Sequence, residues 1–321
     1  MAGPTVSVLM PTYNGARYLR DALDSVLAQT HTDLEVLIRD DGSTDASYDI
    51  VQDYARSDPR FQWISDGRRL GSSGNMVELV KRATGRYLKV LNQDDTLEPT
   101  CIERLLAPML THPEIVLSTS MRRLIDANGH ELPPARFTAP IIDFDAQLPG
   151  RALARILLVF ASNTIGEPST VLFRNGLLDA DTMFDLDGLT FLVNNDIALW
   201  TKLLMLGDAY YVTEVLSNFR MHAEQRSADA DEVVTGAVEW VRLFDFAIRH
   251  GLASEPSDRE TMFDAIVGGF VFSERLVGRH GGPARTRRLS RLQAARRRLE
   301  ASRLEAAPRA HGAVGVAGAV G

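Results

Sequence analysis

The first ninety residues alternate short apolar runs with amphipathic stretches. Runs rich in Val, Leu and Ile are typical of buried parallel strands, and they span residues 5–10, 34–39, 61–64 and 87–91. Between these runs, apolar residues recur at helical spacing, which predicts helices over 16–28, from about 43 to 55, and over 75–83. The polar, glycine-rich segment 66–74 is expected to be a loop. Repeated strand–loop–helix units predict a doubly wound, mostly parallel α/β sheet with right-handed crossovers.

The second half of the chain is less regular. Further helices are predicted over 99–110, 151–160 and 197–206, and further strands over 115–120, 169–173, 210–212 and 215–219. Asp126–Gly129 has the composition of a hairpin turn, and residues 133–150 are expected to be a loop. Two helices are expected between 232 and 277, and an arginine-rich one over 285–304. We therefore expect an α/β domain over 1–227, a helical region over 228–308 and a disordered tail over 309–321.

Polar side chains follow three of the predicted strands, at Pro11–Asn14, Asp40–Asp41 and Asn92–Asp95. The carboxyl ends of parallel strands meet at one edge of a sheet, so these segments should lie together although they are distant in sequence. The adjacent carboxylates of Asp94 and Asp95 repel each other, and a hard divalent cation that also binds phosphate would offset that repulsion. A solvated Asp-Asp turn explains the pair equally well at this stage.

Several function classes lack their sequence signals. Neither Gly-x-Gly-x-x-Gly nor Gly-x-x-x-x-Gly-Lys-Ser/Thr follows the first strand, which argues against a dinucleotide site and a P-loop. Cys101 is the single cysteine, so there is no disulfide framework and no cysteine-based zinc site. The chain starts without the features of a signal peptide, and no apolar run approaches the roughly 20 residues that span a bilayer. We expect a cytoplasmic protein.

Charge is distributed unevenly along the chain. Residues 275–309 carry eleven arginines and two glutamates, a local charge of +9, whereas the whole chain carries −7. The strongly acidic remainder argues against a nucleic-acid-binding core. Within the basic segment, Leu289, Leu292 and Leu299 form a narrow apolar stripe. Two interpretations stay open: the helix lies on the inner face of an anionic membrane as a peripheral contact, or it packs on the domain through its leucines.

Taken together, these segments resemble the family 2 glycosyltransferases, inverting enzymes of the GT-A fold. The resemblance covers roughly residues 5–227, and its pieces occur in the family's order. They are Val8–Asn14, Asp40–Asp45, Gly71 with Asn75, Gly85–Tyr87, Asn92–Asp95, Gly166–Ser169, Asn195-Asp196 and Phe219–His222. The resemblance implies a nucleotide-binding half over 1–120, an acceptor half over 121–227, and transfer of a sugar from a nucleoside diphosphate to an acceptor hydroxyl.

The resemblance also implies roles for the residues that bind the donor. Pro11, Thr12 and Tyr13 would wrap the base, and one of Asp40 and Asp41, with Asp41 favoured, would accept a hydrogen bond from its N3–H. A carboxylate there suits uracil or thymine rather than cytosine. Arg69, with Arg68 beside it, would reach the diphosphate, although two solvated loop arginines explain the pair as well.

The metal and the chemistry are assigned in the same way. Asp95 would bind Mn²⁺ or Mg²⁺ directly, Asp94 would contact the ribose or assist, and His222 would be a third contact. Asn92 stands where the family has an aspartate. Asp196 would be the general base, with Asn195 in place of the family's glutamate, although an Asp at a helix start is also a common N-cap. Two lower-ranked roles complete the set: Arg220 would neutralise the leaving diphosphate, and Glu167 would contact the acceptor.

Two other functions compete with an active glycosyltransferase. A catalytically silent sugar-nucleotide-binding module that works with a partner is suggested by Asn92 and Asn195. A nucleotidyltransferase ranks low because its glycine-rich loop after the first strand is missing. The resemblance leaves the donor sugar, the acceptor and the linkage open. It places the family in surface polysaccharide or glycolipid assembly, so we expect a saccharide or lipid-linked saccharide as acceptor.

Overall fold

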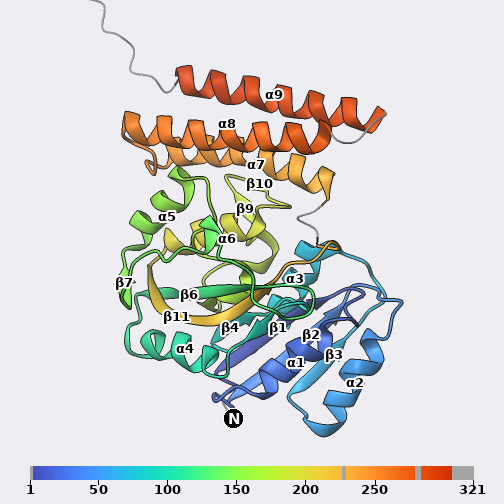
Figure 1. The fold of residues 1–321 in the computed structure, drawn as a ribbon. Coiled ribbons are helices and arrows are strands. Elements are labelled where there is room, and N and C mark those ends of the chain that lie inside the picture. Colours follow the sequence, from blue (N-terminus) through green and yellow to red (C-terminus); the bar gives the residue numbers. More distant parts are fainter. Residues whose placement is uncertain (1–2, 226–228, 279–282, 306–321) are drawn as a thin grey trace, which may run out of the picture.

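A mixed sheet forms the centre of the molecule (Figure 1). The computed structural model describes residues 3–225, 229–278 and 283–305. Within these residues the sheet has nine strands, eight of them in the order β3 (Phe61–Ile64), β2 (Leu34–Asp40), β1 (Val6–Thr12), β4 (Tyr87–Val90), β8 (Leu172–Arg174), β6 (Ile115–Ile125), β11 (Asp208–Arg220) and β5 (Thr96–Leu97). β7 (Ala146–Leu148) pairs with β11.

Strand direction divides the sheet into two parallel groups. β3, β2, β1 and β4 are parallel, and so are β6 and β11. β8 lies between these groups and runs antiparallel to both of its neighbours. The doubly wound, mostly parallel architecture predicted from the sequence is therefore confirmed.

Helices cover both faces of the sheet because its strands are apolar on both sides. Along β1, Val8 and Met10 join the core with α1 (Leu19–Leu27), α2 (Ser47–Ser57) and α4 (Cys101–Thr111). Leu9 points to the other face, where α3 (Gly71–Arg82), α5 (Gly150–Val159) and α6 (Asn195–Leu204) pack. This alternation is the period of two that a strand imposes.

The C-terminal helices α7 (Ala230–Arg249), α8 (Pro256–Gly278) and α9 (Pro283–Glu305) stack as a layer beyond α5 and α6 (Figure 1). Their buried side chains, among them Val234, Phe270 and Leu292, belong to the same apolar cluster as Leu157 of α5 and Trp200 of α6. The helical layer thus shares one core with the sheet. None of the helices in the described part of the chain is both long and apolar enough to cross a membrane.

The structure departs from the sequence-based elements in several places. β5 had no prediction, and β7 and the 3₁₀ turn Arg136–Thr138 lie within residues 133–150, which were expected to be a loop. α3 begins at Gly71 rather than Asn75, so part of the expected loop is helical. The strand expected at 169–173 starts only at Leu172, after the short 3₁₀ turn Pro168–Thr170. The two short strands expected between 210 and 219 are the single strand β11. The hairpin β9 (Asp185–Leu186) and β10 (Leu189–Thr190) had no prediction.

Other expectations hold or lie outside the description. The Asp126–Gly129 turn is present, with the Asp126 N–H donating to the His130 carbonyl at 2.8 Å. Helices α7 and α8 match the two predicted between 232 and 277. The tail expected over 309–321 lies outside the described residues.

Candidate functional site

The three polar strand ends meet at one edge of the sheet, as predicted. The Asp41 N–H donates to the Thr12 carbonyl at 2.8 Å, which joins the ends of β2 and β1. Gln93 follows β4 and makes two hydrogen bonds with Tyr13, which follows β1. The Gln93 Oε1 accepts from the Tyr13 N–H at 2.9 Å, and the Gln93 Nε2 donates to the Tyr13 carbonyl at 3.0 Å. Segments about eighty residues apart in sequence therefore form one surface.

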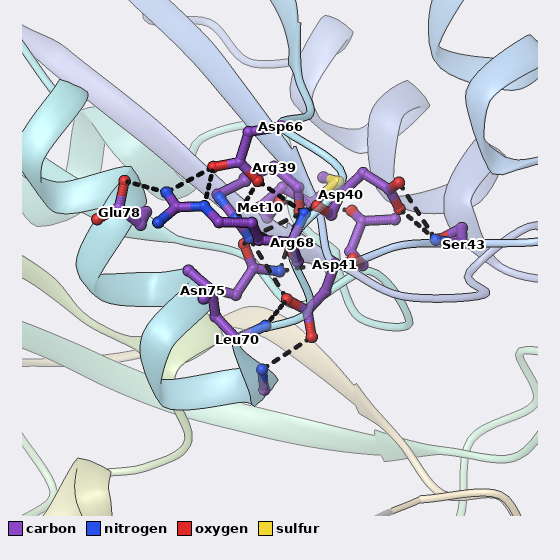
Figure 2. A network of polar contacts seen from close by, with 12 residues as sticks. Met10, Arg39, Asp40, Asp41, Ser43, Asp66, Arg68, Leu70, Asn75 and Glu78 are labelled. Atoms are coloured by element: carbon purple, nitrogen blue, oxygen red, sulfur yellow. Dashed lines mark hydrogen bonds and ion pairs between the residues drawn. The ribbon is translucent and has the colours of Figure 1, made fainter.

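A buried arginine organises the nucleotide side of this edge (Figure 2). Arg39 is fully buried near the end of β2. Its guanidinium donates to Asp66 at 2.9 Å, to the Asn75 amide oxygen at 3.1 Å and to Asp41 at 3.4 Å. Because a buried charge is tolerated only when paired and hydrogen-bonded, these contacts fix the β2 end, the loop after β3 and α3 relative to one another.

Asp40 and Asp41 have different roles. Both carboxylate oxygens of Asp40 face the Ser43 N–H, at 3.0 and 3.2 Å, which ties the turn after β2. Asp41 accepts from the N–H groups of Leu70 and Gly71, at 2.6 and 2.9 Å, at the start of α3. A carboxylate there satisfies free helix donors and suits the helix dipole, which explains why α3 begins earlier than its own sequence predicts.

The loop arginines also differ. Arg68 pairs with Asp66 at 2.7 Å and belongs to the network in Figure 2. The Arg69 guanidinium lies 4.2 Å from the centre of the Tyr13 ring, and Tyr13 is 37% exposed. A cation over an exposed aromatic face beside Asp41 puts Arg69, rather than Arg68, at the open part of the edge.

The adjacent carboxylates after β4 point in different directions. Asp95 is fully buried: its Oδ1 accepts from the Arg220 N–H at 3.0 Å, and its Oδ2 accepts from the Ser169 hydroxyl at 2.6 Å and the Asn92 amide at 3.2 Å. Burial raises the pKa of Asp95, and the neighbouring charge of Asp94 raises it further. Both oxygens of Asp95 are thus enclosed by protein donors, and its expected role as direct metal ligand stays a prediction.

Asp94 instead faces His222, whose Nε2 lies 3.0 Å from the Asp94 Oδ2. The His222 ring packs 4.8 Å from the ring of Tyr18, and its Nδ1 is buried without a hydrogen-bond partner within the described residues. A carboxylate oxygen opposite an imidazole nitrogen is a donor pair for a divalent first-row metal ion. The described residues hold no group of three His, Cys, Asp or Glu side chains for a metal, so this pair could anchor an ion only together with substrate oxygens or water.

Arg220 contacts the backbone of Asp94, next to the Asp94–His222 pair. Its Nε donates to the Asp94 carbonyl at 2.8 Å, its Nη2 pairs with Asp21 at 2.9 Å, and its guanidinium lies over the Tyr18 ring at 4.7 Å. The side chain is 3% exposed. The guanidinium is therefore engaged by protein groups, and its expected contact with a leaving diphosphate stays a prediction.

Asp196 lies at the start of α6, within the residues 121–227 that were expected to bind the acceptor. Its Oδ2 accepts from the Asn163 amide at 2.8 Å, and its Oδ1 accepts from the Ile197 N–H of the first turn at 2.8 Å. The N-cap of α6 is Asn194, so the alternative role of Asp196 as N-cap is not what the structure shows. The residue keeps partial exposure although its carboxylate lies among buried groups. Burial raises the pKa of Asp196 to about 7, and the nearby charge of Glu167 contributes to the rise. A carboxylate with this pKa is suited to general-base chemistry near neutral pH.

Glu167 lies beside Asp196 and forms an ion pair with Arg122, which the sequence did not predict. Its Oε2 is 2.6 Å from the Arg122 Nε, and both side chains are largely buried. Burial raises the pKa of Glu167, while Arg122 opposes that rise. Arg122 is one of two adjacent arginines within β6 and had no sequence signal. Asn163 and Trp200 were also missed: both donate to the Gly166 carbonyl at 3.0 Å and so hold the Gly166-Glu167 turn beside the base.

Comparison with known proteins identifies sequence relatives. Residues 7–174 match the family described as Glycosyl transferase family 2. The chain is 28% identical over 233 residues to an uncharacterized glycosyltransferase of Rickettsia prowazekii, covering 71% of this chain and 67% of the relative. It is 28% identical over 219 residues to a putative teichuronic acid biosynthesis glycosyltransferase of Bacillus subtilis, covering 68% and 79%.

Solved structures share the fold at low identity. The S. aureus protein TarS (residues 1–349), in complex with UDP, aligns over 94% of this chain and 92% of its own with a TM-score of 0.55 at 17% identity. A mannosyltransferase of Pyrobaculum calidifontis in complex with GDP-Man and Mn²⁺ aligns over 94% and 87%, also with a TM-score of 0.55 at 17% identity.

Proposed function

The chain belongs to glycosyl transferase family 2 and is a glycosyltransferase with a GT-A-like fold; from that premise we propose a metal-dependent, inverting enzyme that transfers a sugar from a UDP- or dTDP-sugar. One observation carries the proposal. Asp41, the Asp94–His222 pair and Asp196 come from distant parts of the chain and lie along the carboxyl edge of one sheet. This is where open α/β sheets bind their ligands.

The base of the donor would lie between Tyr13 and Asp41. Asp41 binds the start of α3 and is 4% exposed; its Oδ1 accepts from Leu70 and Arg39, whereas its Oδ2 accepts from Gly71 and keeps a lone pair for a base N3–H. Thr12 and Pro11 form the backbone beside it, and Asp40 holds the neighbouring turn. Arg69, over the Tyr13 ring, is close enough to the open edge to contact the diphosphate. Related folds have been solved with UDP and with GDP-Man, so the choice of base needs a direct test.

The residues present fit a divalent cation held by Asp94 and His222. When bound, Mn²⁺ or Mg²⁺ would supply positive charge to the donor diphosphate. Arg220 would act through Asp94, whose carbonyl it holds, rather than on the leaving group. Asp95 would keep the chain after β4 in place through Ser169 and the Arg220 backbone.

Asp196 would take the proton of the acceptor hydroxyl as that oxygen attacks the anomeric carbon. The bond to the diphosphate breaks in the same displacement, so the anomeric configuration inverts and no covalent intermediate with the protein is required. Asn163 orients the carboxylate, and Glu167 raises its proton affinity. Glu167 itself is paired with Arg122, so we place it beside the base rather than on the acceptor.

The acceptor class follows from the relatives. The Bacillus subtilis relative is named for teichuronic acid biosynthesis, and an Escherichia coli relative, 37% identical over 128 residues but with only 18% of its length covered, is a chondroitin synthase. We propose a saccharide or lipid-linked saccharide acceptor in surface polysaccharide assembly, at the cytoplasmic side of the membrane.

Calorimetric binding of UDP, dTDP, GDP and CDP, with and without Mn²⁺, tests the donor assignment. We expect metal-dependent binding of UDP or dTDP and weak binding of CDP. Tight GDP binding would contradict the proposed hydrogen bond from a base N3–H to Asp41. Transfer from the matching donor, followed by NMR of the product anomer, tests the enzyme and its stereochemistry. Binding without transfer or hydrolysis would favour the silent module suggested by Asn92 and Asn195.

A further inference from the structure

A buried glutamate of the helical layer contacts the segment that leads into the base. Glu239 lies on α7 and is 2% exposed. Its carboxylate accepts from the N–H groups of Leu192 at 2.7 Å, Val193 at 3.2 Å and Asn194 at 2.8 Å. Within the described residues no arginine or lysine pairs with Glu239. Its charge is therefore compensated by successive backbone donors.

The same segment carries a second tie to α7. The Asn194 side chain donates to the Gly236 carbonyl at 2.9 Å, one helical turn before Glu239. A Cβ at Gly236 would lie 3.2 Å from Cγ1 of Val193, so the absence of a side chain permits this close approach. Hydrogen bonds to a charged acceptor are among the stronger ones in proteins. Together these contacts fix the backbone of residues 192–194 against α7.

Residues 192–194 end where the site begins. Asn195 is the first residue of α6 and Asp196 the second. On the other side, the Asn195 amide donates to the Ser73 hydroxyl of α3 at 2.9 Å, and Asn163 holds the Asp196 carboxylate. The start of α6 is thus held by α3 in the nucleotide half, by the loop after α5, and by α7. The matched family segment ends at residue 174, so α6 and α7 both lie beyond it.

We propose that Glu239 is a positioning residue for the base Asp196, and that the helical layer contributes to sugar transfer through this contact. The inference rests on the proposed role of Asp196. A base must lie within hydrogen-bond reach of the acceptor hydroxyl, and a displacement of about 1 Å can reduce turnover on the order of 10²-fold. Glu239 touches neither donor nor acceptor and would act only through residues 192–194.

The test compares Glu239→Gln with Asp245→Asn. In Glu239→Gln the side-chain NH₂ group would face backbone N–H groups of residues 192–194. Two donors cannot bond to each other, so the hold of α7 on these residues should weaken. Asp245 lies on the same helix, and its change removes an ion pair with Arg298 but no contact to residues 192–194. For Glu239→Gln we expect kcat to fall at least tenfold, toward about 10²-fold, with UDP affinity in Mn²⁺ unchanged. Asp245→Asn should leave both near the unaltered values.

Amide hydrogen exchange provides a readout independent of activity. In Glu239→Gln the amides of residues 192–194 should exchange faster, while those inside α6 should not. Faster exchange with unchanged kcat, or equal losses of kcat and UDP binding, would overturn the proposal. If the unaltered chain transfers no sugar, the proposed function fails, and the exchange pattern still decides whether Glu239 holds this segment. Gly236→Ala, which crowds Val193 without removing a charge, should shift kcat in the same direction if Glu239→Gln does not fold.

Discussion

At the scale of single residues, Asp196 combines two properties that a general base needs. It is oriented by Asn163, and burial raises its pKa to about 7. Only the deprotonated carboxylate accepts a proton, so kcat should fall as pH decreases through about 7 and level off above it. A kcat profile between pH 5 and 9 measures this. A limb near the ordinary value of about 4 for aspartate would contradict the assignment.

Substitution provides the matching test of Asp196. Asp196→Asn should lower kcat by about 10²–10⁴-fold and leave UDP binding unchanged, because the residue lies outside the nucleotide pocket. Asp185→Asn, on the β9 hairpin, is a suitable control and should change neither quantity. If Asp196→Asn retained most of the activity, the base would have to be sought elsewhere.

The metal assignment depends on which of two adjacent aspartates faces His222. We predict that Asp94→Asn and His222→Ala each weaken the Mn²⁺-dependent part of UDP binding by about tenfold or more, since each removes one of two protein ligands. Met221→Ala, at an exposed neighbouring position, should have little effect. Titration of UDP with and without Mn²⁺ measures the difference. If Asp95→Asn removes the metal effect and Asp94→Asn does not, the assignment is wrong.

Sequence alone could locate this pair but could not orient it. The strand-end rule predicted that Asn92–Asp95 would lie at the ligand edge. Which carboxylate is enclosed depends on Ser169 and on Arg220, which are 74 and 125 residues away from Asp95 in sequence. For the same reason the sequence could not predict the contacts of Arg220, whose partners Asp21 and Tyr18 come from the first helix and the residue before it.

At the scale of elements, the start of α3 depends on a residue outside the helix. Its first residues are Gly-Ser-Ser-Gly, which local propensity assigns to a loop. Asp41, the residue after β2, supplies the missing cap. Helix caps normally come from the residue just before the helix, so a pattern search along the chain could not have found this one.

The cap predicts a combined effect of substitution at Asp41. Asp41→Ala should reduce the free energy of unfolding by about 1–3 kcal/mol, because it leaves the N–H groups of Leu70 and Gly71 without their acceptor and removes one acceptor of buried Arg39. It should also weaken UDP binding. Urea unfolding and calorimetry measure the two effects. Asp49→Ala, exposed on α2, should change the free energy of unfolding by no more than about 0.5 kcal/mol. If Asp41→Ala lowers the free energy of unfolding but binds UDP with unchanged affinity, Asp41 caps α3 and does not contact the base.

At the scale of the whole molecule, the sequence predicted the sheet and its helices better than the way in which the C-terminal helices pack against them. Alternation and crossover rules predicted a doubly wound, mostly parallel sheet, but not its strand order or the antiparallel β8. An amphipathic helix shows only that one face is covered, not by what. For α9, the sequence therefore left two possible partners for its apolar stripe, a membrane surface and the rest of the domain. In the structure Leu292 and Leu299 are fully buried in the common core, so the domain covers the stripe.

Charge pairing supports the same seating of α9. Arg288 pairs with Asp231 and Arg298 with Asp245 of α7, so arginines of the basic segment meet acids of the layer beneath. These exposed pairs contribute little individually, whereas the buried leucines contribute more. We predict that Leu292→Ala lowers the free energy of unfolding by about 2–5 kcal/mol. Leu304→Ala, in the same helix but 76% exposed, should stay within about 0.5 kcal/mol. Equal, small effects in urea unfolding would mean that α9 leaves the domain in solution, and its leucines would then be free to meet an anionic membrane.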